Sequence, residues 1–187
     1  MAQRLAPLPE RVIAAFAAKL GADVPSQLSP GVAIGTGAGD RVAPRPPLAE
    51  HALLILPLAH QLSTAAVYAE ADRLGLARGA DQLEELAREL EAALEPGARL
   101  PRSLLVNDLE PAAISLCPEV ADALGAVRDA GADHALVCGS GPTVAGLYWD
   151  PDATERAAAA AASLAERFPG ATPAEPAAAD VGRPEPA

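Results

Sequence analysis

The chain has 187 residues, enough for one domain of ordinary size or one domain with part of another. Half of the residues are hydrophobic but only 3% are aromatic, so aliphatic side chains must fill most of the core. The formal net charge of −11 excludes a broadly cationic surface of the kind that binds nucleic-acid phosphates.

The first part of the chain predicts one helix and a small hairpin. Apolar residues at helical spacing indicate a helix over residues 9–20, and Gly21 is a typical residue to end it. Two short strands are predicted over 31–36 and 41–44, on either side of a glycine-rich turn that permits positive φ.

The rest of the chain predicts an α+β fold. Strands are expected over 52–56, 133–138 and 143–149, and helices over 63–74, 81–94, from 107, over 118–131 and over 150–168. This order favours an antiparallel sheet with helices stacked on one face. From residue 169 on, the sequence is rich in Pro and Ala without periodicity, which predicts disorder.

Four short motifs suit a ligand site, although each also has a structural explanation. Asp23 lies between a glycine and a proline, where a rigid turn can hold a catalytic carboxylate or an Asx residue can cap the next turn. Residues 138–143 join two predicted strands and could either bind an anion through backbone N–H groups or only make the turn. Thr64 could hold a substrate or cap its helix. Asn107 and Asp108 open a helix, where a polar first turn is favourable.

The sequence predicts no metal site. The three histidines, His51, His60 and His134, are separated in sequence from one another and from Cys117 and Cys138. This spacing matches no zinc-ligand motif, and two cysteines are too few for a disulfide framework.

The N-terminal segment has no apolar core of the kind found in a signal peptide, and the longest apolar runs are too short to span a bilayer. We therefore expect a cytoplasmic protein without a membrane or nucleic-acid partner. The oligomeric state has no sequence signal.

Taken in order, the motifs resemble one protein family. They are Gly-Ala-Asp-Val-Pro, Gly-Thr-Gly-Ala-Gly-Asp, Leu-Ser-Thr-Ala, Asn-Asp-Leu-Glu and Gly-Ser-Gly-Pro-Thr. The family is that of the 4-diphosphocytidyl-2-C-methyl-D-erythritol kinases, within the GHMP superfamily. The resemblance implies a remnant of the GHMP N-terminal domain over 1–47, a ferredoxin-like GHMP C-terminal domain over 48–168 and a disordered tail over 169–187.

The resemblance also implies roles for individual residues. Asp23 matches the catalytic aspartate that acts as base or orients the hydroxyl in phosphoryl transfer. Thr64 matches a substrate-binding hydroxyl near the methylerythritol moiety, and Gly139, Ser140 and Gly141 match a glycine loop that borders the active site. ATP and Mg²⁺ are the implied cofactors, and a small molecule is the implied partner.

The chain departs from the family pattern at several positions. Ser26 and Gln27 stand where aromatic residues are usual, Cys138 replaces a serine and Ala145 replaces an aromatic residue. Only 22 residues precede Asp23, and they contain no glycine-rich phosphate loop. We therefore expect the chain to be truncated and to lack kinase activity by itself.

The implied function is ATP-dependent phosphorylation of the 2-hydroxyl of 4-diphosphocytidyl-2-C-methyl-D-erythritol, a step of non-mevalonate isoprenoid precursor biosynthesis. Two alternatives remain at this point. The chain could be a non-catalytic binding or interaction module derived from a GHMP C-terminal domain, or another GHMP small-molecule kinase of the homoserine or mevalonate type.

Overall fold

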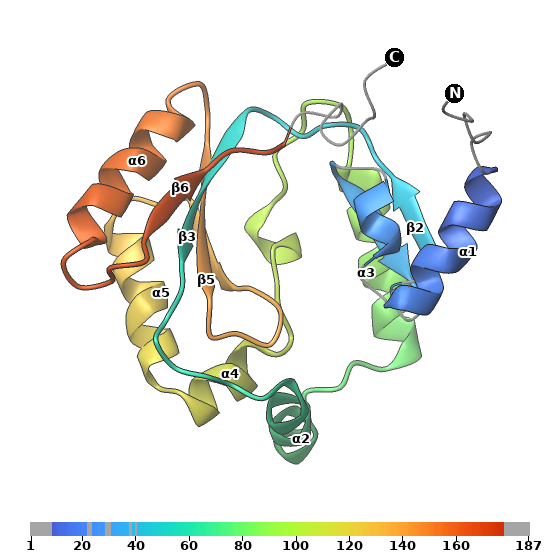
Figure 1. Cartoon of the computed structure of the whole chain (residues 1–187), viewed down its shortest axis with the longest axis horizontal. Coiled ribbons are helices and arrows are strands. Elements are labelled where there is room, and N and C mark those ends of the chain that lie inside the picture. The colour runs from blue at the N-terminus through green and yellow to red at the C-terminus, as the bar shows by residue number, and fades with distance from the viewer. Residues whose placement is uncertain (1–8, 22–23, 29–30, 38, 40, 178–187) are drawn as a thin grey trace, which may run out of the picture. The chain divides into compact units, whose positions relative to one another are not determined.

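The computed structural model describes residues 9–21, 24–28, 31–37, 39 and 41–177 (Figure 1). The chain divides into two compact units. One contains residues 1–47 and 177–187, and the other contains residues 48–176. Among the helices described, none is both long and apolar enough to cross a bilayer.

The smaller unit contains the predicted helix and hairpin. Its elements are α1 (Glu10–Leu20), the 3₁₀ helix η1 (Pro25–Leu28), β1 (Ala33–Thr36) and β2 (Arg41–Pro44). The two strands pair antiparallel, and Gly37 and Gly39 in the connecting turn have φ of 70° and 88°. A side chain at either position would strain the backbone, which explains why the turn is rich in glycine.

The larger unit is built around a four-stranded antiparallel sheet. Its elements are β3 (His51–Leu56), α2 (Thr64–Leu74), α3 (Ala80–Ala93), η2 (Arg102–Leu104), α4 (Glu110–Leu116), α5 (Glu119–Asp129), β4 (His134–Val137), β5 (Val144–Trp149), α6 (Ala153–Leu164) and β6 (Thr172–Ala174). The strand order is β4-β5-β3-β6. Helices separate β3 from β4 and β5 from β6, so the unit has the β-α-β-β-α-β order of ferredoxin-like folds. The predicted α+β class is confirmed.

Helices α5 and α6 cover one face of the sheet, where Figure 1 shows them next to each other. Strand β3 alternates between partly buried and fully buried side chains, and its buried set faces these helices. Helix α6 buries four alanines, which are Ala153, Ala157, Ala160 and Ala161. Such short side chains let the helix lie close to the strands, so a core with few aromatic residues can still pack densely.

Gly146, in the middle of β5, lies where α5 packs closely against the sheet. A Cβ atom at this position would lie 2.5 Å from Cγ1 of Val127 on α5 and 3.3 Å from Cβ of Ala132. Val127 is completely buried and its branched side chain has little freedom to move. A glycine is therefore required at this position for α5 to pack as it does.

Strand β6 corrects the prediction that the chain is disordered from residue 169. Thr172–Ala174 pairs antiparallel with the outer edge of β3, and Phe168 and Ala171 pack against the core just before it. Pro173 donates no backbone hydrogen bond, but a proline is tolerated here because β6 is the last strand of the sheet. The strand forms through backbone pairing with β3. A segment this short carries no periodic pattern of apolar side chains that could have predicted it.

We predict that Gly146→Ala lowers the free energy of unfolding by about 1–3 kcal/mol, because the added methyl group overlaps the immobile Val127 side chain. Urea unfolding followed by circular dichroism measures the change.

Gly125→Ala is the matched control. Gly125 lies within α5, and no atom lies within 4 Å of the position of an added Cβ. This variant should be more stable than the original chain by about 0.5–1 kcal/mol, because alanine favours a helix over glycine. Equal effects of the two substitutions would contradict the packing described for β5.

Candidate functional site

Thr64 and Asn107, two of the polar residues singled out in the larger unit, meet at the turn between β4 and β5. This turn, residues 138–143, is here called the glycine loop. The backbone N–H of Cys138 donates to the Thr143 carbonyl at 2.8 Å, and that of Gly141 donates to the Cys138 carbonyl at 2.9 Å. Gly139 and Gly141 have φ of 56° and 78°, values that side chains rarely allow. The loop is therefore tightly closed by its own backbone.

Gly141 also lets the loop lie against the segment that leads into α2. A Cβ atom on Gly141 would lie 3.5 Å from Cδ1 of Leu62 and 3.1 Å from Cγ1 of Val137. Leu62 precedes Ser63, the N-cap residue of α2. The segment before α2 therefore lies next to the loop, within ordinary van der Waals distance of the Gly141 position.

Thr64 and Ser140 are brought together by this packing, although they are far apart in the sequence. The Oγ1 atom of Thr64 lies 3.1 Å from Oγ of Ser140, within hydrogen-bond distance, and the pair is exposed. The Ser63 side chain makes no capping hydrogen bond at the start of α2. The two neighbouring hydroxyls, at a helix N-terminus and beside glycine backbone, form a polar surface that can accept and donate hydrogen bonds to a ligand.

Asn107 holds the glycine loop from its other side. Its Nδ2 atom donates to the carbonyl of Val137 at 2.8 Å and to the carbonyl of Gly139 at 2.7 Å. Its Oδ1 atom accepts the N–H of Leu109 at 2.9 Å. In addition, the Glu110 carboxylate accepts the N–H of Val137 at 3.2 Å. The segment that opens α4 therefore fixes the end of β4 and the start of the loop.

Asp108 is engaged in an ion pair with Arg78. Two guanidinium nitrogens of Arg78 donate to the two carboxylate oxygens at 2.5 and 2.6 Å. These hydrogen bonds hold the pKa of Asp108 below its ordinary value and raise that of Arg78. A cavity of about 380 Å³ opens beside this pair, and charged side chains of both signs, among them Arg102, Arg128 and Glu110, line it.

Helix α2 is positioned by α4. Val67 and Ala71 of α2 pack against Ala112 of α4 in a small buried cluster. At the rim of this contact, the Glu70 carboxylate accepts two hydrogen bonds from Arg73 at 2.6 Å and one from the hydroxyl of Ser115. These bonds, with Arg73 as the largest cause, lower the pKa of Glu70 from 4.5 to about 2. Glu70 therefore links the helix that carries Thr64 to the helix that Asn107 precedes.

Asp23, the predicted catalytic residue, lies outside the described residues. Of the other predicted site residues, the structure brings together Thr64, Gly139, Ser140 and Gly141 within the larger unit.

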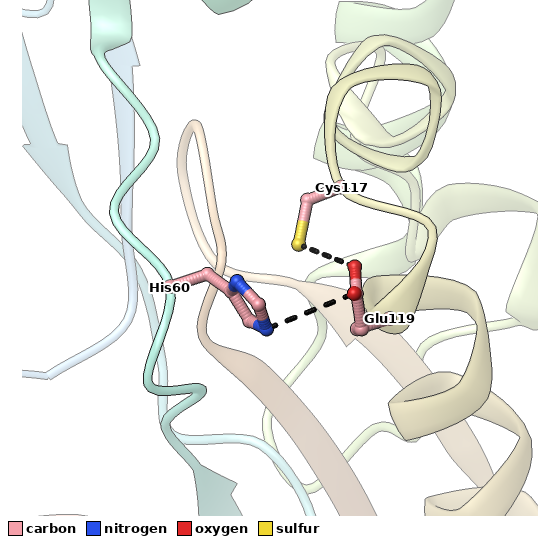
Figure 2. A group of neighbouring side chains, drawn as sticks. All are labelled: His60, Cys117 and Glu119. Atoms are coloured by element: carbon pink, nitrogen blue, oxygen red, sulfur yellow. Dashed lines mark hydrogen bonds and ion pairs between the residues drawn. The ribbon is translucent and has the colours of Figure 1, made fainter.

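A second group of side chains has no signal in the sequence. His60, Cys117 and Glu119 each place one ligand-type atom within 4.8 Å of the others (Figure 2). The sequence predicted His60 to be isolated from both cysteines, but folding brings the segment after β3 to the junction of α4 and α5. No local spacing could have revealed this contact.

Comparison with protein families identifies the class of the larger unit. Residues 80–167 match the family described as GHMP kinases C terminal. This part of the chain is therefore similar to a GHMP kinase C-terminal domain, and the fold implied by the resemblance is confirmed.

Within that class, two similar curated proteins carry the same kinase name. The 4-diphosphocytidyl-2-C-methyl-D-erythritol kinase of Streptomyces coelicolor is 45% identical over 135 residues, which is 71% of this chain and 44% of that protein. The protein of the same name from Arthrobacter sp. is 41% identical over 157 residues, which is 82% of this chain and 47% of that protein. The predicted resemblance is confirmed, and the chain spans about half the length of these curated relatives.

Solved structures agree with this class. The crystal structure of a 4-(cytidine 5'-diphospho)-2C-methyl-D-erythritol kinase superposes with a TM-score of 0.63 and 26% identity, covering 87% of this chain and 56% of the other. Homoserine kinase from Cytophaga hutchinsonii superposes with a TM-score of 0.54 at 20% identity, covering 80% of this chain and 48% of the other. At that identity, the second likeness concerns the fold alone.

We predict that the contribution of Glu70 to stability depends on pH. Its pKa in the folded chain, about 2, is below the ordinary 4.5, so its ionised form stabilises the fold. This stabilisation is present above about pH 4.5 and is lost as the pH falls toward 2. Glu70→Gln should therefore unfold at lower urea concentration than the original chain near neutral pH, and the difference should shrink in acid.

Glu85→Gln is the control for this experiment. Glu85 pairs with Arg88 three residues away on α3, where both side chains are more than half exposed. Exposed pairs of this kind contribute little. Identical urea midpoints for Glu70→Gln and Glu85→Gln near neutral pH would show that Glu70 does not couple α2 to α4.

Proposed function

We propose that this chain is the C-terminal part of a kinase that transfers the γ-phosphoryl group of ATP to the 2-hydroxyl of 4-diphosphocytidyl-2-C-methyl-D-erythritol. The observation that carries the proposal is the 41–45% identity to curated kinases of that name, which extends over most of this chain. The likeness to homoserine kinase is confined to the fold, so the identities favour the methylerythritol substrate.

The geometry of the larger unit supports a binding surface for the substrate's polyol. The Thr64 and Ser140 hydroxyls lie 3.1 Å apart and are exposed, so a substrate hydroxyl could replace or join their mutual hydrogen bond. Gly139 leaves the backbone before Ser140 open to close approach, because nothing beyond its chain neighbours lies within 4 Å of the position of an added Cβ. Asn107 keeps this backbone in place from the opposite side.

The proposed chemistry needs a group that receives the substrate proton. In the proposal, Asp23 orients the 2-hydroxyl and accepts its proton while the hydroxyl oxygen bonds to the γ-phosphorus. The bond from the γ-phosphorus to the bridging oxygen breaks, and ADP leaves. Thr64 and Ser140 contribute by binding and orientation, which is where most of the catalysis of phosphoryl transfer originates.

Mg²⁺ is the implied metal of such a reaction, but the described residues around the glycine loop do not fit it. Mg²⁺ prefers free carboxylate and phosphate oxygens. The Asp108 carboxylate is occupied by Arg78, and the Glu110 carboxylate accepts the Val137 N–H. Both carboxylates are thus already engaged within the protein.

A chimera tests the proposal directly. The N-terminal part of the Streptomyces coelicolor kinase that this chain does not match would be joined to residues 10–187, and ADP release would be measured with 4-diphosphocytidyl-2-C-methyl-D-erythritol. We expect turnover that falls by about 10²–10⁴-fold in Asp23→Asn, because the proton acceptor is removed. Thr64→Val should raise KM by about 2- to 10-fold, the effect of one lost hydrogen bond.

Thr154→Val is the matched control, since Thr154 lies in the first turn of α6 and bonds to Glu175. It should leave the kinetics unchanged. A folded chimera that turns over homoserine or mevalonate instead would contradict the proposed substrate. A folded chimera without any kinase activity would favour a non-catalytic binding module.

A further inference from the structure

His60, Cys117 and Glu119 come from two segments that fold against each other. His60 lies in the connection between β3 and α2, Cys117 is the C-cap residue of α4, and Glu119 is the first residue of α5. Figure 2 shows the imidazole, thiol and carboxylate directed toward one another. One imidazole nitrogen, the sulfur and one carboxylate oxygen all lie within 4.8 Å of one another.

The separations are close to those of a tetrahedral metal site. Bonds of about 2.0–2.3 Å to zinc place two tetrahedral ligand atoms about 3.3–3.8 Å apart. The Sγ atom of Cys117 lies 3.3 Å from Oε2 of Glu119, and Nε2 of His60 lies 3.9 Å from Oε1 of Glu119. The two contacts use different oxygens of the Glu119 carboxylate, so a side-chain rotation that turns one oxygen toward both the sulfur and the imidazole would direct all three ligands at one ion.

Hydrogen bonds already fix the backbone of Cys117, one of the three ligands. The N–H of Cys117 donates to the Ala113 carbonyl at 2.9 Å, and the N–H of Val120 donates to the Cys117 carbonyl at 3.0 Å. Cys117 is 4% exposed, so its sulfur faces the site from the interior. The His60 and Glu119 side chains are 51% and 53% exposed, which leaves a path for an ion and freedom for His60 to turn.

The mixture of donor atoms selects the metal. Zn²⁺ binds sulfur, nitrogen and oxygen together, whereas Mg²⁺ and Ca²⁺ require oxygen ligands. Three protein ligands leave one coordination position for water or another small ligand. The donor set therefore differs in kind from the Mg²⁺ requirement of a kinase.

We propose that His60, Cys117 and Glu119 form a zinc-binding site. Coordination breaks the S–H bond of Cys117, forms a zinc–sulfur bond and releases the proton to solvent. The ion ties the connection between β3 and α2 to the junction of α4 and α5. Since that connection leads directly into Thr64, zinc would stiffen the segment that carries one of the two paired hydroxyls.

Cobalt substitution tests the site on the 187-residue chain under reducing conditions. Titration with Co²⁺ should produce one equivalent of a tetrahedral spectrum with a thiolate-to-cobalt charge-transfer band, and Zn²⁺ should displace it while Mg²⁺ should not. Cys117→Ala should abolish the charge-transfer band. His60→Ala and Glu119→Gln, at exposed positions, should weaken zinc binding by at least about 10-fold.

Cys138→Ala is the control, because Cys138 is the other thiol of the chain and is exposed. It should bind Co²⁺ and Zn²⁺ as the original chain does. The proposal would be overturned by loss of the charge-transfer band in Cys138→Ala. Persistence of the band in Cys117→Ala, or unchanged zinc affinity in His60→Ala, would overturn it as well. Failure to bind one equivalent of either ion would also overturn it. If Cys117→Ala does not fold, His60→Ala and Glu119→Gln decide the question, since both change exposed side chains.

Discussion

The side-chain amide of Asn107 organises the surface around the glycine loop. Two carbonyl groups, one at the end of β4 and one inside the loop, accept from the same NH₂ group, while the amide oxygen caps the segment before α4. Only an uncharged amide can donate two hydrogen bonds and accept one in this way. Gly139 and Gly141 have no side chains that could anchor the loop. Its position therefore depends on hydrogen bonds that neighbouring elements make to its backbone.

Thr64 reaches the same loop through a different set of contacts. The buried cluster between α2 and α4 sets the position of α2, and Glu70 links the two helices by accepting from Ser115. Because α4 is also the helix that follows Asn107, both sides of the glycine loop depend on a single short helix. The close packing of α5 at Gly146 and the small residues of α6 hold the sheet that carries the loop. The proposed zinc site would add a third link at the end of α4.

The sequence predicted much of this fold because periodic apolar patterns mark its longer helices and strands. It missed β6, where backbone pairing with β3 and not a side-chain pattern makes the strand. The family resemblance implied that Thr64 and Ser140 border one site, but their contact was not predicted, since no spacing rule relates residues that far apart. His60, Cys117 and Glu119 were missed for the same physical reason: their proximity depends on tertiary packing. The role of Asp23 stays a prediction.

Hydrogen–deuterium exchange of Asn107→Asp tests most directly whether the Asn107 amide organises the glycine loop. The carboxylate keeps the acceptor for Leu109 but turns two donated hydrogen bonds into repulsion with the Val137 and Gly139 carbonyls. The account predicts at least about 10-fold faster exchange at the amides of Cys138 and Gly141, with unchanged exchange in the ladder between β3 and β5. Unchanged exchange in the loop would contradict the account.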